Sequence, residues 1–165
     1  MLGKRILDPK GIESDQSEIA GLGLFPIETI FNQEKVTKQV KARHLQSGKM
    51  LEGYEIHMGL TTQLEEIDPI LEITEYGGDK VSLSDGCSIR NGQVWGTYLH
   101  GLFDNDEFRR DFLNDLRIRK GYATSSTTSS TKLVREEVFD RLANLIRKNI
   151  DRDLFLRLLE KKKAL

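Results

Sequence analysis

The sequence predicts an α/β protein, and three observations lead to this fold class. Runs of strand-forming residues recur between residues 34 and 99. A helical pattern with its own start and stop signals then occupies residues 104–121. Further helical patterns follow a stretch rich in Ser and Thr. Strands and helices mixed in one chain of 165 residues are typical of a single domain with a sizeable core.

Three short runs carry the first strand signals. In EKVTKQVKA, residues 34–42, polar and apolar side chains alternate, which is typical of a half-exposed strand. GYEIHMG, residues 53–59, alternates as well and places Glu55 and His57 on one face. The run ILEIT, residues 70–74, predicts another strand.

The segment GCSIRNGQVWGTYL contains the strongest hairpin signal in the chain. Asn91-Gly92 lies between two strand-like runs, and both residues tolerate the positive φ of a two-residue turn. The second arm, residues 94–99, is almost wholly apolar, as expected for a strand covered on both faces. This arm leads directly into His100.

The next pattern predicts a helix. Asp104 and Glu107 have the spacing of a capping box, with Asp in place of the usual Ser or Thr. Gly121 is a suitable stop. The apolar stripe between them consists of Phe108, Phe112, Leu113 and Leu116.

The chain divides into a main domain, a linker and a helical tail. Residues 1–120 form the expected domain, with irregular, turn-rich structure in residues 1–33. The Ser/Thr-rich residues 121–132 predict a mobile linker, because such side chains bury little surface. Residues 133–165 carry two helical patterns, the second with Asp151 as its cap, and are expected to pack on the same domain.

Composition excludes several classes of protein. The net charge of −1 provides no electrostatic case for binding nucleic acid or an anionic membrane. No apolar run approaches the roughly 18 residues of a membrane-spanning helix, and the N-terminus lacks the apolar region of a signal peptide, so we expect a cytoplasmic protein. With one cysteine, Cys87, and no pair of histidines spaced for a helical metal site, we expect no disulfide and no bound metal.

The histidines are the main candidates for chemistry. His100 ends an apolar strand run, where α/β proteins gather functional groups, and its imidazole is suited to general base catalysis. A structural role at the strand end stays open for it. His57 either lines the same pocket as His100 or is a satisfied core histidine, whereas His44 is expected to be structural. We expect Cys87 to lie elsewhere and to be no nucleophile, because Asp85 would raise its pKa.

Four segments in order resemble the C-terminal glutamine amidotransferase domain of the cobyric acid synthase family: GLGLFPIETIF, KVTKQVKARH, GYEIHMG and GTYLHGLFDNDEFRRDFLNDLR. The resemblance runs from residue 1 to about residue 160, and the combination of GYEIHMG with GTYLHGLFDN is its specific part. It implies a partial flavodoxin-like, class I glutamine amidotransferase sheet. Two alternatives stay open: the related cobyrinic acid a,c-diamide synthase family, and a non-enzymatic scaffold or binding module.

The resemblance also implies a chemistry. In the family a cysteine attacks the amide of glutamine, and a histidine that matches His100 activates the cysteine and protonates the departing ammonia. Glu55, His57 and Gly59 become candidates for the substrate pocket. The expected partner is an N-terminal synthetase domain, where ATP with Mg²⁺ activates a corrinoid carboxylate that the ammonia then amidates. No cofactor is expected in this chain itself.

This chain departs from the family pattern in two places. The family's nucleophile motif ends in Met-Leu-Gly, and residues 1–3 are those three, so we expect a chain that starts after the nucleophile and is inactive alone as a glutaminase. The strands absent with it would leave an exposed sheet edge that favours self-association. In class I enzymes a glutamate follows the histidine by two residues, and here that residue is Leu102. A Cys-His dyad is therefore expected, with Asp104 open as an orienting carboxylate.

Overall fold

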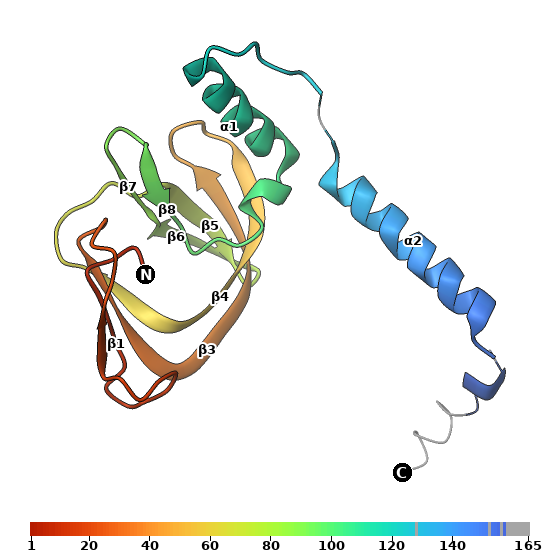
Figure 1. The fold of residues 1–165 in the computed structure, drawn as a ribbon, viewed down its shortest axis with the longest axis horizontal. Helices are drawn as coiled ribbons and strands as arrows, with labels where there is room; N and C mark the ends of the chain where they lie inside the picture. The colour runs from red at the N-terminus through yellow and green to blue at the C-terminus, as the bar shows by residue number, and fades with distance from the viewer. Residues whose placement is uncertain (128, 152, 156, 158–165) are drawn as a thin grey trace.

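The computed structural model describes residues 1–127, 129–151, 153–155 and 157. In chain order the elements are β1 (Arg5–Leu7), β2 (Glu18–Ala20), β3 (Ile27–His44), β4 (Met50–Gln63), β5 (Leu71–Tyr76), β6 (Asp79–Asp85), β7 (Cys87–Ile89), β8 (Val94–Gly96), the 3₁₀ turn η1 (Leu102–Asp104), α1 (Asp106–Arg119) and α2 (Thr131–Asn149). The strands gather in one body, and the two helices extend from it (Figure 1).

Strand β3 is the centre of a six-stranded sheet. It pairs antiparallel with β4 along one edge, while its other edge is shared between β1, which runs parallel to it, and β5, which runs antiparallel. The order is β2-β1-β3-β5-β6, with β4 also on β3, and β7 and β8 form a separate two-stranded sheet. This mixed sheet with a few helices confirms the α/β class and is consistent with the predicted partial flavodoxin-like sheet.

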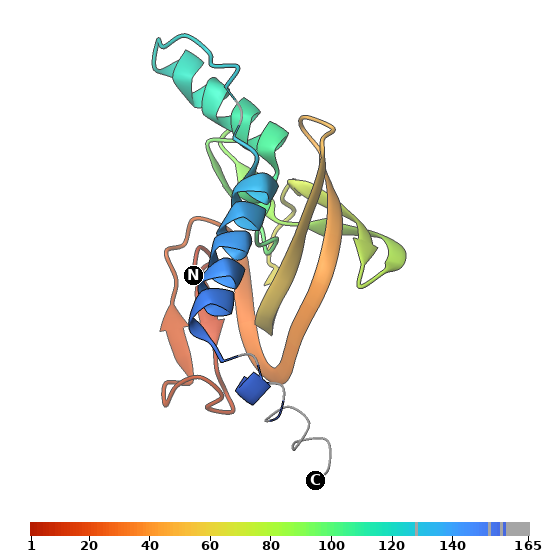
Figure 2. The ribbon, with the colours of Figure 1, turned by 90° about the vertical axis from the view of Figure 1, so that its right-hand side faces the viewer.

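The β3–β4 hairpin is the longest paired unit and bends strongly (Figure 2). The predicted strands at residues 34–42 and 53–59 lie inside it. The expectation of irregular structure up to residue 33 is wrong, because residues 27–31 pair with residues 59–63 of β4 before a register shift. Ile, Thr and Phe side chains in that stretch favour the pleated conformation.

The core lies where β3, β4 and β5 meet the segment around η1 and α1. Its buried members are Val40, Ala42, Leu51, Ile70, Leu71, Ile73, Leu99, Leu102 and Phe108. Burying a side chain such as Leu51 or Leu71 stabilises the fold by roughly 2 kcal/mol. Because Leu99 and Leu102 are part of this core, the backbone of His100 between them is held against the sheet.

The Asn91-Gly92 hairpin is present, but its second arm is shorter than predicted. Arg90 and Asn91 have φ of 53° and 54°, and Gly92 has φ of 76°, so three residues adopt the left-handed conformation at the turn. Strand β8 ends at Gly96, and its side chains are half-buried rather than covered on both faces. Thr97 ends the strand, since its hydroxyl bonds both Asp85 and the N–H of Leu99.

The start of α1 differs from the predicted capping box. Asn105, not Asp104, is the N-cap residue, and neither the Asp104 nor the Glu107 side chain forms the expected cap. The amide of Asn105 instead bonds the carbonyls of Gly101 and Leu102. The predicted stop is confirmed: Gly121 has φ of 77°, and the N–H groups of Gly121 and Tyr122 close the helix on Ile118 and Arg117.

Helix α2 projects away from the sheet (Figure 1). No side chain of α2 is buried, and the packing of residues 133–165 on the domain stays a prediction. The polar side chains of Asp106 and Arg109 hold Thr131 at the start of α1, which directs α2 outward. Asp151 accepts bonds from the N–H groups of Asp153 and Leu154, as its predicted cap role requires. Of the predicted apolar residues of that last helix, Leu158 and Leu159 lie outside the described residues.

Candidate functional site

His100 lies against the edge of β4 that faces away from β3. The N–H of His100 donates to the carbonyl of Tyr54 at 2.8 Å, and the N–H of Tyr54 donates to the carbonyl of His100 at 3.2 Å. The two rings stack, with centroids 5.2 Å apart and planes 11° from parallel. The His100 side chain is exposed on its remaining sides, so a reacting group in solvent or on another part of the protein can reach it.

Gly53 allows this close approach. A Cβ at Gly53 would overlap the carbonyl oxygen of His100 and lie 2.8 Å from Cδ1 of Leu99. After His100 the chain turns at Gly101, with φ of 79°, into η1. The side chain of Asn105 then bonds both the N–H and the carbonyl of Glu52. The segment with His100 is therefore fastened to β4 on both sides of the histidine.

Neither candidate for an orienting carboxylate reaches the His100 ring. Leu102 is 7% exposed and belongs to the core. The Asp104 carboxylate pairs with Arg135 of α2 at 2.8 Å. Within the part of the chain that the structure describes, no side chain hydrogen-bonds the imidazole nitrogens of His100, and its ring contact is the stack on Tyr54.

Glu55, His57 and Gly59, the candidates for the substrate pocket, lie on β4. Glu55 is 8% exposed, and one of its oxygens lies 3.4 Å from Nε2 of His57. Nδ1 of His57 hydrogen-bonds the carbonyl of Gly59 at 2.9 Å, which makes Nδ1 the donor. The His57 ring also packs on Tyr98, with centroids 4.9 Å apart. These contacts hold His57 in one orientation.

Comparison with known proteins assigns the chain to a family. A family model described as the CobB/CobQ-like glutamine amidotransferase domain matches residues 1–108. The chain belongs to the CobB/CobQ-like glutamine amidotransferase domain family. The match includes the β4 candidates Glu55, His57 and Gly59 as well as His100, and all of them lie in its second half.

Three relatives share the name cobyric acid synthase. The protein of Thermoanaerobacter sp. (strain X514) is 41% identical over 172 residues, which cover 99% of this chain and 34% of the relative. The protein of Streptococcus sanguinis (strain SK36) is 42% identical over 152 residues, which cover 92% of this chain and 30% of the relative. The protein of Clostridium tetani (strain Massachusetts / E88) is 40% identical over 159 residues, which cover 96% of this chain and 32% of the relative. This amidotransferase domain therefore spans about a third of the length of the relatives that it matches.

In the amidotransferase domain His57 and His100 have different surroundings, so the alternative in which both line one pocket is not the arrangement found. Alternation along β4 directs Tyr54 and His57 to opposite faces of the strand. His100 stacks on Tyr54, whereas His57 packs on Tyr98 and lines a cavity of about 430 Å³. Each histidine has its own aromatic partner.

Cys87 lines the same 430 Å³ cavity as His57, so the expectation that it lies away from both histidines is wrong. Pairing of β7 with β8 brings Cys87 opposite Gly96. Cys87 is 7% exposed, and burial, reinforced by the charge of Asp85, raises the pKa of its thiol. The thiol is therefore protonated at neutral pH, which does not suit a nucleophile.

Sequence reasoning did not single out Tyr98 and Thr61, which lie at this cavity. The Thr61 hydroxyl bonds the hydroxyl of Thr29 at 2.7 Å and the phenol of Tyr98. Asp85 accepts a bond from the Thr97 hydroxyl at the same wall. Tyr98 stands two residues before His100 in the GTYLHG motif, and this was the available signal.

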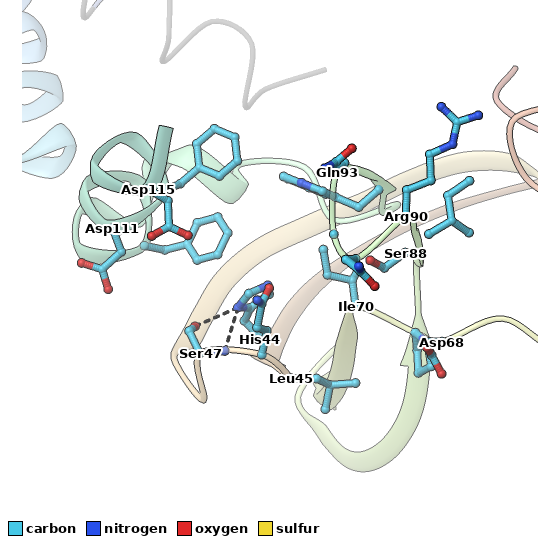
Figure 3. Close-up of a pocket in the computed structure, with 18 of the residues that line it drawn as sticks. His44, Leu45, Ser47, Asp68, Ile70, Ser88, Arg90, Gln93, Asp111 and Asp115 are labelled. Carbon is cyan, nitrogen blue, oxygen red and sulfur yellow. Dashed lines mark hydrogen bonds between the residues drawn. The ribbon is translucent and has the colours of Figure 1, made fainter. Parts of the chain in front are cut away.

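His44 is one of the residues that line a larger cavity, of about 1260 Å³ (Figure 3). Ser47 donates its backbone N–H and its hydroxyl to Nδ1 of His44, and the ring packs edge-on against Phe108 with centroids 5.0 Å apart. Burial lowers the pKa of His44. Together these contacts fit the expected structural role.

Acidic side chains border the larger cavity from separate elements. Asp111 and Asp115 come from α1, and Asp68 lies across the cavity beside Ser88 (Figure 3). Among the described residues no group of three or more His, Cys, Asp or Glu side chains is arranged to hold a metal ion. The described helices also include none that is long and apolar enough to span a membrane.

Proposed function

We propose that this chain is the part of a cobyric acid synthase that releases ammonia from glutamine. Membership in the glutamine amidotransferase family and the shared name of the three relatives support the proposal. The observation that carries it is the geometry of His100, an exposed imidazole at the end of GTYLH whose ring stacks on Tyr54.

His100 acts in this proposal first as a base and then as an acid. It takes the proton of a cysteine thiol as the thiolate attacks the carboxamide carbon of glutamine. It then gives that proton to the departing nitrogen, which leaves as ammonia when the carbon–nitrogen bond breaks. Water hydrolyses the resulting thioester and releases glutamate. The exposure of the His100 side chain supports this double role.

The thiol in this reaction is not Cys87. Its burial and its raised pKa keep it protonated, and it lies at the cavity of His57 rather than beside His100. No other cysteine is present among the 165 residues. We therefore propose that a cysteine outside these residues is the nucleophile and that this chain alone has no glutaminase activity.

Glu55, His57 and Gly59 are proposed to border the glutamine site. Support comes from the 430 Å³ cavity that His57 and Gly59 line and from the fixed orientation of the His57 ring. Glu55 is engaged by His57 and is also close enough to Tyr76 to help raise the pKa of that phenol, after burial. Its proposed role is to hold His57 rather than to contact glutamine.

The remaining two thirds of the relatives' length accommodates a synthetase part. We propose that ammonia passes to that part, where ATP with Mg²⁺ activates a corrinoid carboxylate in the cytoplasm. This chain itself then needs no cofactor, and neither nucleic acid nor a membrane takes part. The names of the relatives favour this substrate over that of an a,c-diamide synthase.

The test is a His100→Ala substitution in the complete parent enzyme. We expect glutamine-dependent amidation to fall by at least a hundredfold, because general acid–base catalysis typically contributes about 10²–10⁴-fold. Amidation with ammonium chloride should be unchanged, since free ammonia bypasses the glutaminase step. Both rates and the melting temperature are measured on the same preparation.

Asp104→Asn is the matched control. It removes a charge four residues from His100 and breaks only the pair with Arg135, so both rates should remain at the level of the unmodified enzyme. If His100 were structural, its loss would lower the melting temperature and both activities together. Glutamine-dependent turnover that survives in a well-folded His100→Ala enzyme would overturn the assignment and leave a scaffold role.

A further inference from the structure

We propose that Tyr54 is the positioning residue of His100 and performs by ring stacking the orienting role that a carboxylate has in other hydrolytic triads. This inference rests on the proposed function of His100. It assigns a role to the tyrosine of GYEIHMG, which lies 46 residues before His100 in the sequence and directly beside it in the structure.

An exposed imidazole needs a restraint to act as a base. The torsion that rotates a histidine ring is broad, so an unrestrained ring samples many directions. His100 is exposed, and no described side chain hydrogen-bonds its nitrogens. Proton transfer requires the nitrogen to lie within hydrogen-bond reach of the proton that it accepts, so a freely rotating ring would be productive for only part of the time.

Tyr54 provides that restraint. Its ring lies nearly parallel to the His100 ring, at 11° and 5.2 Å between centroids. The paired backbone bonds between the two residues fix where both side chains start. Gly53 lets the strands approach closely enough for the stack, because a side chain there would collide with the His100 carbonyl. The ring stack, the paired backbone bonds and the small residue at position 53 together place the Tyr54 ring against the His100 ring.

The carboxylates of Asp104 and Glu55 contact other residues rather than the His100 ring. Asp104 pairs with Arg135, and Glu55 is directed to the opposite face of β4 from Tyr54, where it contacts His57. Leu102 occupies the position of the glutamate of class I enzymes and lies in the core. Tyr54 is left as the side chain that sets the plane of the His100 ring.

Stacking differs from a carboxylate hydrogen bond in one useful respect. A carboxylate holds one imidazole nitrogen and fixes the tautomer, whereas Tyr54 covers a ring face and leaves both nitrogens of His100 free. The ring plane is thus restrained while the proton can enter and leave at either nitrogen. A residue that serves as base and then as acid is compatible with this arrangement.

The first test examines the stack itself in this chain, without activity. Magnetic shielding by the Tyr54 ring should move the His100 ring-proton signals in an NMR spectrum upfield. Tyr54→Phe should keep that displacement, and Tyr54→Leu should abolish it. Tyr122→Leu, which removes an exposed tyrosine beyond α1, is the matched control and should leave the His100 signals in place. Identical His100 signals in the Leu and Phe variants of Tyr54 would overturn the proposed stack.

The second test uses the complete enzyme with the same substitutions. Tyr54→Leu should lower glutamine-dependent kcat about tenfold, the upper range of an aromatic pair's effect, with KM for glutamine unchanged. Tyr54→Phe should stay within about twofold of the parent. Ammonia-dependent amidation and the melting temperature should not change in either variant, which separates positioning from a general loss of structure.

His100→Ala distinguishes failure of this inference from failure of the proposed function. If His100→Ala abolishes glutamine use while Tyr54→Leu behaves like the parent, the function stands and the positioning role is wrong. If His100→Ala has no effect, the proposed function itself fails. A drop in both activities for Tyr54→Leu, together with a lower melting temperature, would assign Tyr54 a structural role only.

Discussion

Cys87 and His57 line one cavity, but the surroundings of Cys87 keep its thiol protonated. His57 is half-buried with both nitrogens close to fixed oxygens. Cys87 is buried, and burial together with the charge of the Asp85 carboxylate disfavours a thiolate. Proximity to a histidine therefore does not activate this cysteine.

We expect the thiol of Cys87 to resist alkylation in the folded chain. At pH 7 a thiol with a pKa above its usual value is ionised in less than about 3% of molecules, and burial further blocks the reagent. Iodoacetamide labelling followed by mass spectrometry measures the rate, with the urea-unfolded chain as the control. Labelling of the folded chain as fast as the unfolded one would contradict this expectation and make Cys87 a candidate nucleophile.

At this scale the sequence singled out His100 but predicted neither its exact setting nor its partner. Residue type and the motif GTYLHG are local features, whereas the expected strand stops at Gly96, before His100. The stack on Tyr54 depends on the pairing of residues 54 and 100, which follows from how the chain returns to β4. No local pattern encodes that return. For the same reason the cavity shared by His57 and Cys87 was not foreseen.

Among the elements, the connection between β1 and β2 depends on one carboxylate. Asp8 accepts bonds from the backbone N–H groups of Ile12, Glu13 and Ser14 at 2.7, 2.8 and 3.0 Å. These bonds, the one from Ile12 foremost, hold the pKa of Asp8 below its ordinary value against the opposing effect of burial. The loop is thus fastened by the ionised form of the side chain.

Asp8 should make stability depend on pH in the acid range. A carboxyl whose folded pKa is lowered stabilises the fold above its unfolded pKa of about 4, and this contribution is lost as pH falls through the folded pKa. Asp8→Asn should therefore be less stable than the parent at pH 7, and the difference should shrink at pH 3. Urea unfolding midpoints at both pH values measure it.

The neighbouring Asp15 provides the control for this experiment. Its side chain is exposed in the same loop, so Asp15→Asn should leave the unfolding midpoint at either pH unchanged. A pH-independent difference between the parent and Asp8→Asn would show that ionisation of Asp8 does not fasten the loop.

Element boundaries were predictable where local chemistry sets them. Gly121 ends α1 through its own left-handed backbone, and this end was predictable because glycine is the residue that most readily adopts that conformation. The start of α1 is set by Asn105, whose amide bonds Glu52 on β4. The local spacing of Asp104 and Glu107 therefore predicted the wrong cap residue. Strand β8 ends early because Thr97 bonds Asp85 of β6. Both errors come from contacts made across the sheet.

For the molecule as a whole, α2 presents an unusual surface. Its exposed apolar side chains are Leu133, Val134, Val138, Phe139, Leu142, Leu145 and Ile146. Soluble monomeric proteins rarely expose large contiguous apolar patches, because water disfavours them. The helix pattern was predictable from the sequence, whereas its direction depends on the clamp that Asp106 and Arg109 form around Thr131.

We expect this chain to self-associate in solution through α2. Sedimentation velocity over a hundredfold range of concentration should show a rising average mass for the parent chain. Leu142→Lys combined with Leu145→Lys should shift the chain toward monomer, since two charges interrupt the apolar stripe. The same charges at polar positions, Asn144→Lys with Asn149→Lys, are the control and should leave association intact. A parent chain that is monomeric at every concentration would contradict this expectation.

The register of β4 also limits how the length of this chain can vary. Tyr54 and His57 are an odd number of residues apart, which is why they face opposite sides of the strand and serve different partners. An insertion or deletion of one residue between them would move His57 to the side of Tyr54 and His100 and remove it from Tyr98. Length changes in the turn at residues 45–49 leave that parity untouched. The tolerated place for an added residue is therefore the turn, and the short stretch between Tyr54 and His57 admits substitution but no change in length.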